Sequence, residues 1–197
     1  EDGEIQFGHH AKTKEEFMQM TEANDFAHLL KYLKAVKDGF IDIPSGTLHA
    51  IGKGVLTYNI SRNADCTLRL YDYDRIDPAT GKKRDIQPEA VYDNVNIPDT
   101  STTFVVYPSA YERGIHVTRY WDEPGLYTLL RLQVEAQGSF KHDRFAFYTC
   151  VKGEGSIQGV PIRQGETILV PHGMGMLEFK GAMDLFLASY RNEKDEA

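Results

Sequence analysis

One glycine-proline turn pattern occurs twice in the chain, and it limits the folds available to it more than any other feature. Each copy has a glycine, then Pro-x-Gly after four or five residues, then a marked position after two more. The marked position is His49 in the copy that starts at Gly39 and Met176 in the copy that starts at Gly165. Pro-x-Gly makes a tight turn that directs the next strand inward. The repeat therefore predicts two similar β-barrel modules, one with an inward histidine and one without.

The sequence beyond residue 39 predicts an all-β protein. Short runs rich in Val, Ile, Thr, Tyr and Phe alternate with Gly, Pro, Asn and Asp, a pattern typical of sandwiches and barrels. We expect a long polar loop over residues 74–89 and a solvated tail over residues 191–197. The predicted strands cover residues 40–43, 55–60, 67–71, 104–107, 116–121, 125–134, 145–152, 168–170 and 184–190.

Before that point the sequence predicts helix. Thr13 and Glu16 form a Thr-x-x-Glu capping box. Apolar residues then recur at helical spacing over residues 14–33. This stretch predicts two short helices, with a break and a second N-cap at the Asn24-Asp25 pair.

The charge balance argues against nucleic acid as a partner. The chain has 22 Lys and Arg residues against 29 Asp and Glu, a formal net charge of -7, whereas nucleic-acid binding depends on a basic face. One small phosphate needs only a local cluster of cations, so a sugar phosphate stays compatible. Cys66 and Cys150 are far apart, and the start does not resemble a signal peptide, which favours reduced thiols in the cytoplasm. No apolar run is long enough to span a bilayer.

The turn pattern that ends at His49 resembles the second conserved motif of the cupin superfamily. Cupins are mainly-β, jelly-roll-like barrels of the double-stranded β-helix type. By that resemblance His49 points into the barrel and holds a metal, because a neutral imidazole on a rigid strand is a good ligand for zinc or iron. The alternative is a buried, hydrogen-bonded barrel histidine. The adjacent pair His9-His10 is expected in a solvated loop, with side chains that point apart.

Two longer strings, residues 43–54 and 69–75, resemble the type I mannose-6-phosphate isomerases of Gram-positive bacteria. The resemblance implies an isomerase that interconverts mannose 6-phosphate and fructose 6-phosphate through an enediol, with one zinc ion per full-length protein. It also implies that His49 is a zinc ligand and that Arg69 is the active-site arginine. Without the family pattern, Arg69 would be interpreted as a surface or ion-pair residue. Lys53 either reaches the substrate phosphate or solvates a turn.

Two departures from the family pattern bear on activity. Asn59 stands where close relatives have a glutamate, and an amide cannot take a proton near neutral pH. The family's remaining zinc ligands come from segments upstream of the helical insertion, and no matching segment occurs here. We therefore expect residues 1–100 to hold the helical insertion and part of the metal-binding module, and residues 101–197 to form a metal-free cupin module. The chain, which starts without Met, is expected to be a C-terminal part that is inactive alone.

Two rival functions stay open. One is a non-catalytic sugar-phosphate-binding cupin with a degenerate site, which Asn59 favours. The other is a different metal-dependent cupin enzyme such as an iron dioxygenase, against which the family-like string from Tyr71 to Arg75 argues. The oligomeric state cannot be inferred from the sequence.

Overall fold

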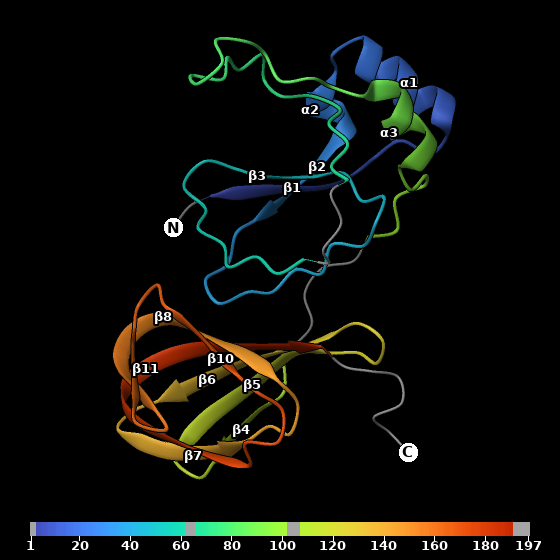
Figure 1. The fold of residues 1–197 in the computed structure, drawn as a ribbon. Coiled ribbons are helices and arrows are strands. Elements are labelled where there is room, and N and C mark those ends of the chain that lie inside the picture. The colour runs from blue at the N-terminus through green and yellow to red at the C-terminus, as the bar shows by residue number, and fades with distance from the viewer. Residues whose placement is uncertain (1–2, 62–65, 102–106, 191–197) are drawn as a thin grey trace. The chain divides into compact units, whose positions relative to one another are not determined.

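The chain divides into two compact units, Glu1–Phe104 and Val105–Ala197. The computed structural model in Figure 1 describes residues 3–61, 66–101 and 107–190. Strand is the dominant regular element across these residues, which confirms the mainly-β fold class. None of the helices in the described part of the chain is long and apolar enough to span a membrane.

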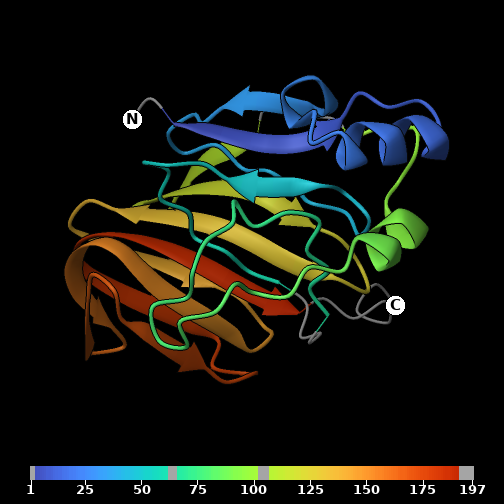
Figure 2. The same cartoon turned by 90° about the horizontal axis from the view of Figure 1, so that it is seen from above.

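The first unit is built on a small antiparallel sheet in which β1 (Glu4–His9) lies between β2 (Leu30–Lys34) and β3 (His49–Ile51). Its helices are α1 (Lys14–Glu22), α2 (Phe26–Leu29) and α3 (Pro88–Asn94). Figures 1 and 2 both show α1 and α3 side by side. Between them the rings of Phe17 and Tyr92 meet edge to face at 6.1 Å. This small apolar cluster is the core of the unit.

The predicted capping box is confirmed, but the second helix is shorter than expected. The Thr13 side chain accepts a hydrogen bond from the Glu16 N–H at 3.2 Å and starts α1. The chain leaves helix at Leu29 because residues 30–34 pair with β1 as β2. Tertiary pairing therefore overrides the helical spacing of this segment. The sequence analysis also missed α3, which Pro88 begins at the end of the predicted loop.

Three strands predicted in the first unit do not form. Residues 40–43, 55–60 and 67–71 are irregular, although their composition favours strand. A strand is stabilised by its pairing with neighbours, and β-rich composition alone does not supply a partner. The predicted strand over 104–107 lies mostly outside the described residues, and so does the predicted tail.

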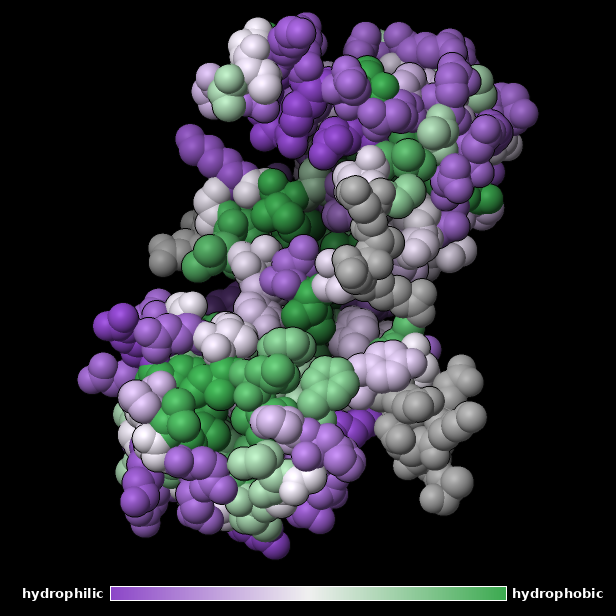
Figure 3. Space-filling model, in the orientation of Figure 1, coloured by the Kyte–Doolittle hydropathy of each residue, from purple (hydrophilic) through white to green (hydrophobic). Residues whose placement is uncertain are grey.

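The second unit is one antiparallel sheet with the strand order β10-β8-β11-β6-β5-β4. The short strands β7 and β9 pair with β11 and β8 respectively. Buried side chains such as Leu132, Tyr148 and Leu185 fill one face, while hydrophobic residues also reach the surface shown in Figure 3. The strands predicted over residues 116–121, 125–134, 145–152, 168–170 and 184–190 all form, but their first and last residues differ from the prediction. The strands are β4 (Ser109–Glu112), β5 (Ile115–Asp122), β6 (Tyr127–Val134), β7 (Gln137–Lys141), β8 (Ala146–Ile157), β9 (Val160–Arg163), β10 (Thr167–Val170) and β11 (Met176–Tyr190).

The second copy of the turn pattern forms as expected, but its marked position does not point inward. Gly165 and Gly173 have positive φ of 90° and 81° on either side of β10, a conformation that favours glycine. Met176 then begins β11 but is 36% exposed, whereas the next residue, Leu177, is buried in the core. Successive side chains alternate between the faces of a strand. The predicted inward position is therefore wrong for Met176.

Candidate functional site

The first copy of the turn pattern positions His49 at the start of β3. The Thr47 N–H donates to the Pro44 carbonyl at 3.1 Å, which closes the turn. Gly46 has φ +82°, and a Cβ there would lie 2.7 Å from the Asn94 carbonyl oxygen. Only glycine fits this close approach without displacing a neighbour. The turn is thus seated against the end of α3 before the chain enters β3.

The His49 side chain is exposed, with Nδ1 2.9 Å from the Thr47 carbonyl oxygen. Because a carbonyl only accepts, Nδ1 is the donor, and in the neutral imidazole the lone pair is then on Nε2. Such a second contact orients many metal-binding histidines. Within the described residues, however, no three His, Cys, Asp or Glu side chains form a group that could hold a metal. His49 can supply one ligand, but it does not make a metal site with its described neighbours. It is also not the buried barrel histidine of the alternative interpretation.

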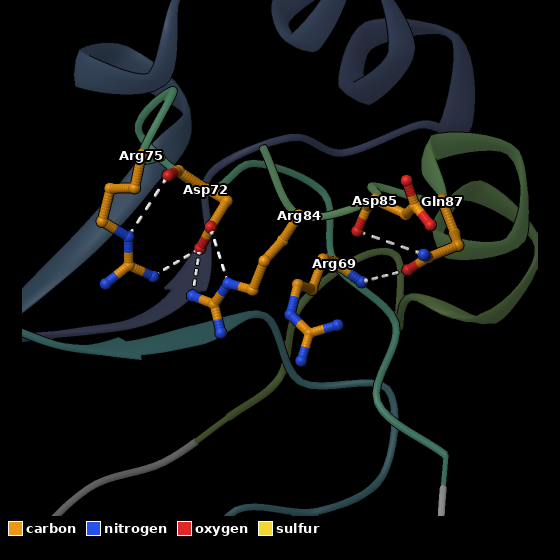
Figure 4. Close-up of polar contacts among 6 residues, drawn as sticks. All are labelled: Arg69, Asp72, Arg75, Arg84, Asp85 and Gln87. Carbon is orange, nitrogen blue, oxygen red and sulfur yellow. Dashed lines mark hydrogen bonds and ion pairs between the residues drawn. The ribbon is translucent and has the colours of Figure 1, made fainter. Parts of the chain in front are cut away.

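Arg69 is fixed through its backbone while its guanidinium stays unpaired. The Arg69 N–H donates to Gln87 Oε1 at 3.1 Å, and the Gln87 N–H donates to the Arg69 carbonyl at 2.7 Å. The next residue, Leu70, is buried in the core of the first unit. Among the residues that the structure describes, none forms a hydrogen bond or ion pair with the Arg69 guanidinium (Figure 4). Within the described residues Arg69 is therefore not the ion-pair residue of the alternative interpretation.

A carboxylate pairs with the two other arginines of this region. Arg84 donates to Asp72 through Nε at 2.9 Å and through Nη2 at 2.6 Å, and Arg75 Nη2 contacts the same carboxylate (Figure 4). Hydrogen bonds from Arg84 first and Arg75 second lower the pKa of Asp72 to about 2. Asp72 is consequently ionised at any physiological pH. The cluster of Arg69, Arg75, Arg84 and Asp72, the arginine cluster, has three cations and one anion.

The turn that carries Asp72 is tight and unusual. Tyr73 and Asp74 both have positive φ, 55° and 52°. The Arg75 N–H donates to the Asp72 carbonyl at 3.1 Å and closes the turn. Asparagine and glycine usually occupy such positions. The ion pair between Asp72 and Arg75 spans the turn and stabilises it.

The other predicted site residues lie elsewhere in the first unit. Lys53 is exposed in a turn after β3, and Asn59 is exposed in an irregular segment. No contact within the described residues joins either of them to Arg69 or to His49. The sequence analysis in turn missed Asp72, Arg84 and Gln87. Alternating charges near residues 72–84 were a signal, but they did not show which residues pair.

The predicted solvated loop at His9 is wrong. His9 is buried at the end of β1, with Nε2 2.9 Å from the Asn96 carbonyl oxygen and its ring 4.8 Å from that of Phe17. Burial lowers the pKa of His9. This histidine is a core residue of the first unit because β1 extends further than the Gly8-His9 sequence suggests.

Comparison with known proteins identifies relatives over nearly the whole chain. No family model matches. The mannose-6-phosphate isomerase ManA of Bacillus subtilis is 34% identical over 185 residues, which cover 91% of this chain and 58% of the relative. The mannose-6-phosphate isomerase of Streptococcus mutans is 33% identical over 200 residues, covering 98% and 61%. The chain thus spans about three fifths of the length of these relatives.

A solved structure supports the same relationship. The crystal structure of the mannose 6-phosphate isomerase from Bacillus subtilis matches 95% of this chain and 60% of its own, with a TM-score of 0.89 and 26% identity. The apo enzyme from Salmonella typhimurium matches with a TM-score of 0.68 and 12% identity, a likeness of fold alone.

Proposed function

The chain is a homologue of the mannose-6-phosphate isomerases over nearly its whole length and has their cupin fold; from this premise we propose that it is part of an enzyme that interconverts mannose 6-phosphate and fructose 6-phosphate. The substrate is then a small sugar phosphate. Segments outside this chain complete the enzyme, because the relatives are longer.

The unpaired guanidinium of Arg69 is the observation that carries the proposal. An aldose-ketose isomerase moves a proton between adjacent carbons, and negative charge develops on the oxygens of the enediolate. A fixed cation with free donors stabilises that charge most when it is already in place before the reaction. Arg69 has this property, since Gln87 holds its backbone and no described group neutralises its side chain.

His49 is proposed as one ligand of a zinc ion whose other ligands lie outside this chain. Its Nε2 is free to bind a metal because Nδ1 is bonded to Thr47. When bound, zinc would add positive charge beside the enediolate oxygens. The described residues do not complete such a site, so no catalytic step is assigned to the ion here.

The proposal also covers Lys53, the two modules of the chain and the cellular compartment. Lys53, exposed in its turn, is proposed as a contact to the substrate phosphate. Residues 1–100 would form the helical insertion and part of the metal-binding module, and residues 101–197 a metal-free module. Cys66 and Cys150 are free, in keeping with a cytoplasmic enzyme.

The second candidate is a non-catalytic cupin that binds a sugar phosphate. Asn59 favours it, because an amide cannot act as the acid or base that the reaction needs. A coupled assay for fructose 6-phosphate on the complete enzyme separates the two functions. Turnover that disappears in Arg69→Ala supports the isomerase. Binding of mannose 6-phosphate with no turnover in the wild type supports the second candidate.

A further inference from the structure

Arg84 is held by Asp72 but retains donors for another partner. Its Nε and Nη2 each donate a hydrogen bond to one oxygen of the Asp72 carboxylate. The Asp72 side chain is only 10% exposed, whereas that of Arg84 is 41% exposed. Nη1 of Arg84 forms no hydrogen bond to any residue in the described ranges. The side chain is thus fixed at one edge and open at the other.

Figure 4 shows how the three arginines are arranged around the carboxylate. The guanidinium of Arg84 lies directly below the Asp72 carboxylate in this view, and that of Arg69 lies to its right. Arg75 lies on the opposite side of Asp72. Neighbouring guanidinium groups repel each other. The Asp72 carboxylate compensates Arg84 and Arg75, whereas none of the described residues pairs with the Arg69 guanidinium. Positive charge therefore accumulates beside Arg69 in a chain whose net charge is -7.

A substrate that carries a phosphate and develops negative charge at a second centre could use both the open edge of Arg84 and the unpaired guanidinium of Arg69. We propose that Arg84, positioned by Asp72, binds the phosphate group of the substrate while Arg69 faces the reacting carbons. That the ligand is a sugar phosphate rests on the proposed function, whereas the binding of a phosphate group by Arg84 does not. Arginine suits a phosphate because its planar fork of donors matches the geometry of the oxygens. Lys53, an exposed point charge in a turn, is then a peripheral contact.

Binding of inorganic phosphate to the 197-residue protein tests this without any catalysis. We expect Arg84→Gln to weaken binding about tenfold or more, the range for a charge-assisted contact. Arg75→Gln removes the same charge from the other side of Asp72 and should change binding less than about threefold. Arg163→Gln, which changes an exposed arginine of the second unit that is paired with Glu166, should have no effect. Equal losses in Arg84→Gln and Arg75→Gln, or no phosphate binding by the wild type, overturn the proposal.

The sign of the effect of Asp72→Asn tests the positioning role. The substitution makes the cluster more positive, so charge alone predicts tighter phosphate binding. Loss of the carboxylate frees Arg84, so positioning predicts weaker binding, with partial recovery in Asp72→Glu. Tighter binding in Asp72→Asn contradicts the positioning role. If Asp72→Asn does not fold by circular dichroism, Arg84→Lys keeps the charge, removes the fork and should still bind more weakly.

Kinetics of the complete enzyme separate this inference from the proposed function. Phosphate contacts exist in both ground and transition states, so Arg84→Gln should raise KM about tenfold or more and change kcat less than Arg69→Ala does. An unchanged KM in an active enzyme overturns the inference and leaves the isomerase function intact. Phosphate binding that depends on Arg84, in a complete protein that shows no turnover, supports the inference and overturns the isomerase function.

Discussion

Gln87 holds the backbone of Arg69 from both sides: its Oε1 accepts from the Arg69 N–H at 3.1 Å and its own N–H donates to the Arg69 carbonyl at 2.7 Å. Gln87 directly precedes α3, so the helix and Arg69 are linked through one residue. The orientation of the Arg69 guanidinium therefore depends on a residue 18 positions away in the sequence.

We expect Gln87→Ala to lower kcat of the complete enzyme several-fold and to cost about 1 kcal/mol of stability, the usual contribution of one hydrogen bond. The backbone bond between the two residues remains, so the loss should be smaller than that in Arg69→Ala. Gln158→Ala is a matched control, because Gln158 Oε1 also accepts from a backbone N–H, that of Glu178, in the second unit. Steady-state kinetics and chemical denaturation measure the two effects. Equal kcat in both variants would mean that Gln87 does not position Arg69.

Arg69→Ala should lower kcat of the complete enzyme on the order of a hundredfold or more, since it removes a preorganised cation that stabilises developing negative charge. The fold should persist, because the guanidinium makes no hydrogen bond or ion pair with any described residue. Arg163→Ala serves as the control arginine. Near-normal turnover in a folded Arg69→Ala variant would remove Arg69 from the proposed site.

Gly46→Ala should destabilise the first unit by more than Gly54→Ala does. Both glycines have positive φ, so both variants suffer backbone strain. A Cβ at Gly46 also meets the Asn94 carbonyl oxygen, whereas one at Gly54 meets nothing within 4 Å. We expect a difference of about 1 kcal/mol or more in the free energy of unfolding. If the two variants have the same free energy of unfolding, the close contact between the Gly46 turn and the end of α3 does not contribute to stability.

The sequence predicted the second unit better than the first, and the difference has a physical cause. In the second unit the predicted strands from residue 116 onward find their partners among the described residues, as β8 does with β10 and β11. In the first unit the strand-like residues 55–60 and 67–71 find none among the described residues and stay irregular. His9 was misread because its burial depends on α1 and on Asn96, which local sequence does not reveal.

The candidate site shows the same limit. Arg69 and His49 were identified from the short sequence segments that contain them, 69–75 and 43–54. Asp72 pairs with Arg84 across a loop of irregular chain, and several other basic residues lie close to Asp72 in sequence. The three-dimensional structure shows that the carboxylate holds Arg84 and Arg75 and leaves Arg69 unpaired among the described residues.

His142 predicts a pH dependence of stability in the second unit. Desolvation first, and nearby Arg144 second, lower the pKa of His142 to about 4 from an ordinary 6.5. The unfolded chain therefore binds a proton between these values that the folded protein does not, so stability is present above about pH 6.5 and is lost as pH falls toward about 4. The loss should reach up to about 3 kcal/mol, at about 1.4 kcal/mol per unit. The difference in unfolding free energy between wild type and His142→Gln isolates it from the carboxylates. Exposed His172→Gln is the control, and a difference that does not vary with pH would contradict the assignment.

The last prediction concerns zinc: the 197-residue protein should bind it weakly or not at all and should show no isomerase activity. Catalytic zinc sites use about three protein ligands, and the described residues offer no group of three around His49. One imidazole cannot hold the ion against water and buffer. Metal analysis after dialysis, together with the coupled assay for fructose 6-phosphate, measures both properties, and His49→Ala is the control. Stoichiometric zinc that is lost in His49→Ala, or measurable turnover, would show that the site is complete within this chain.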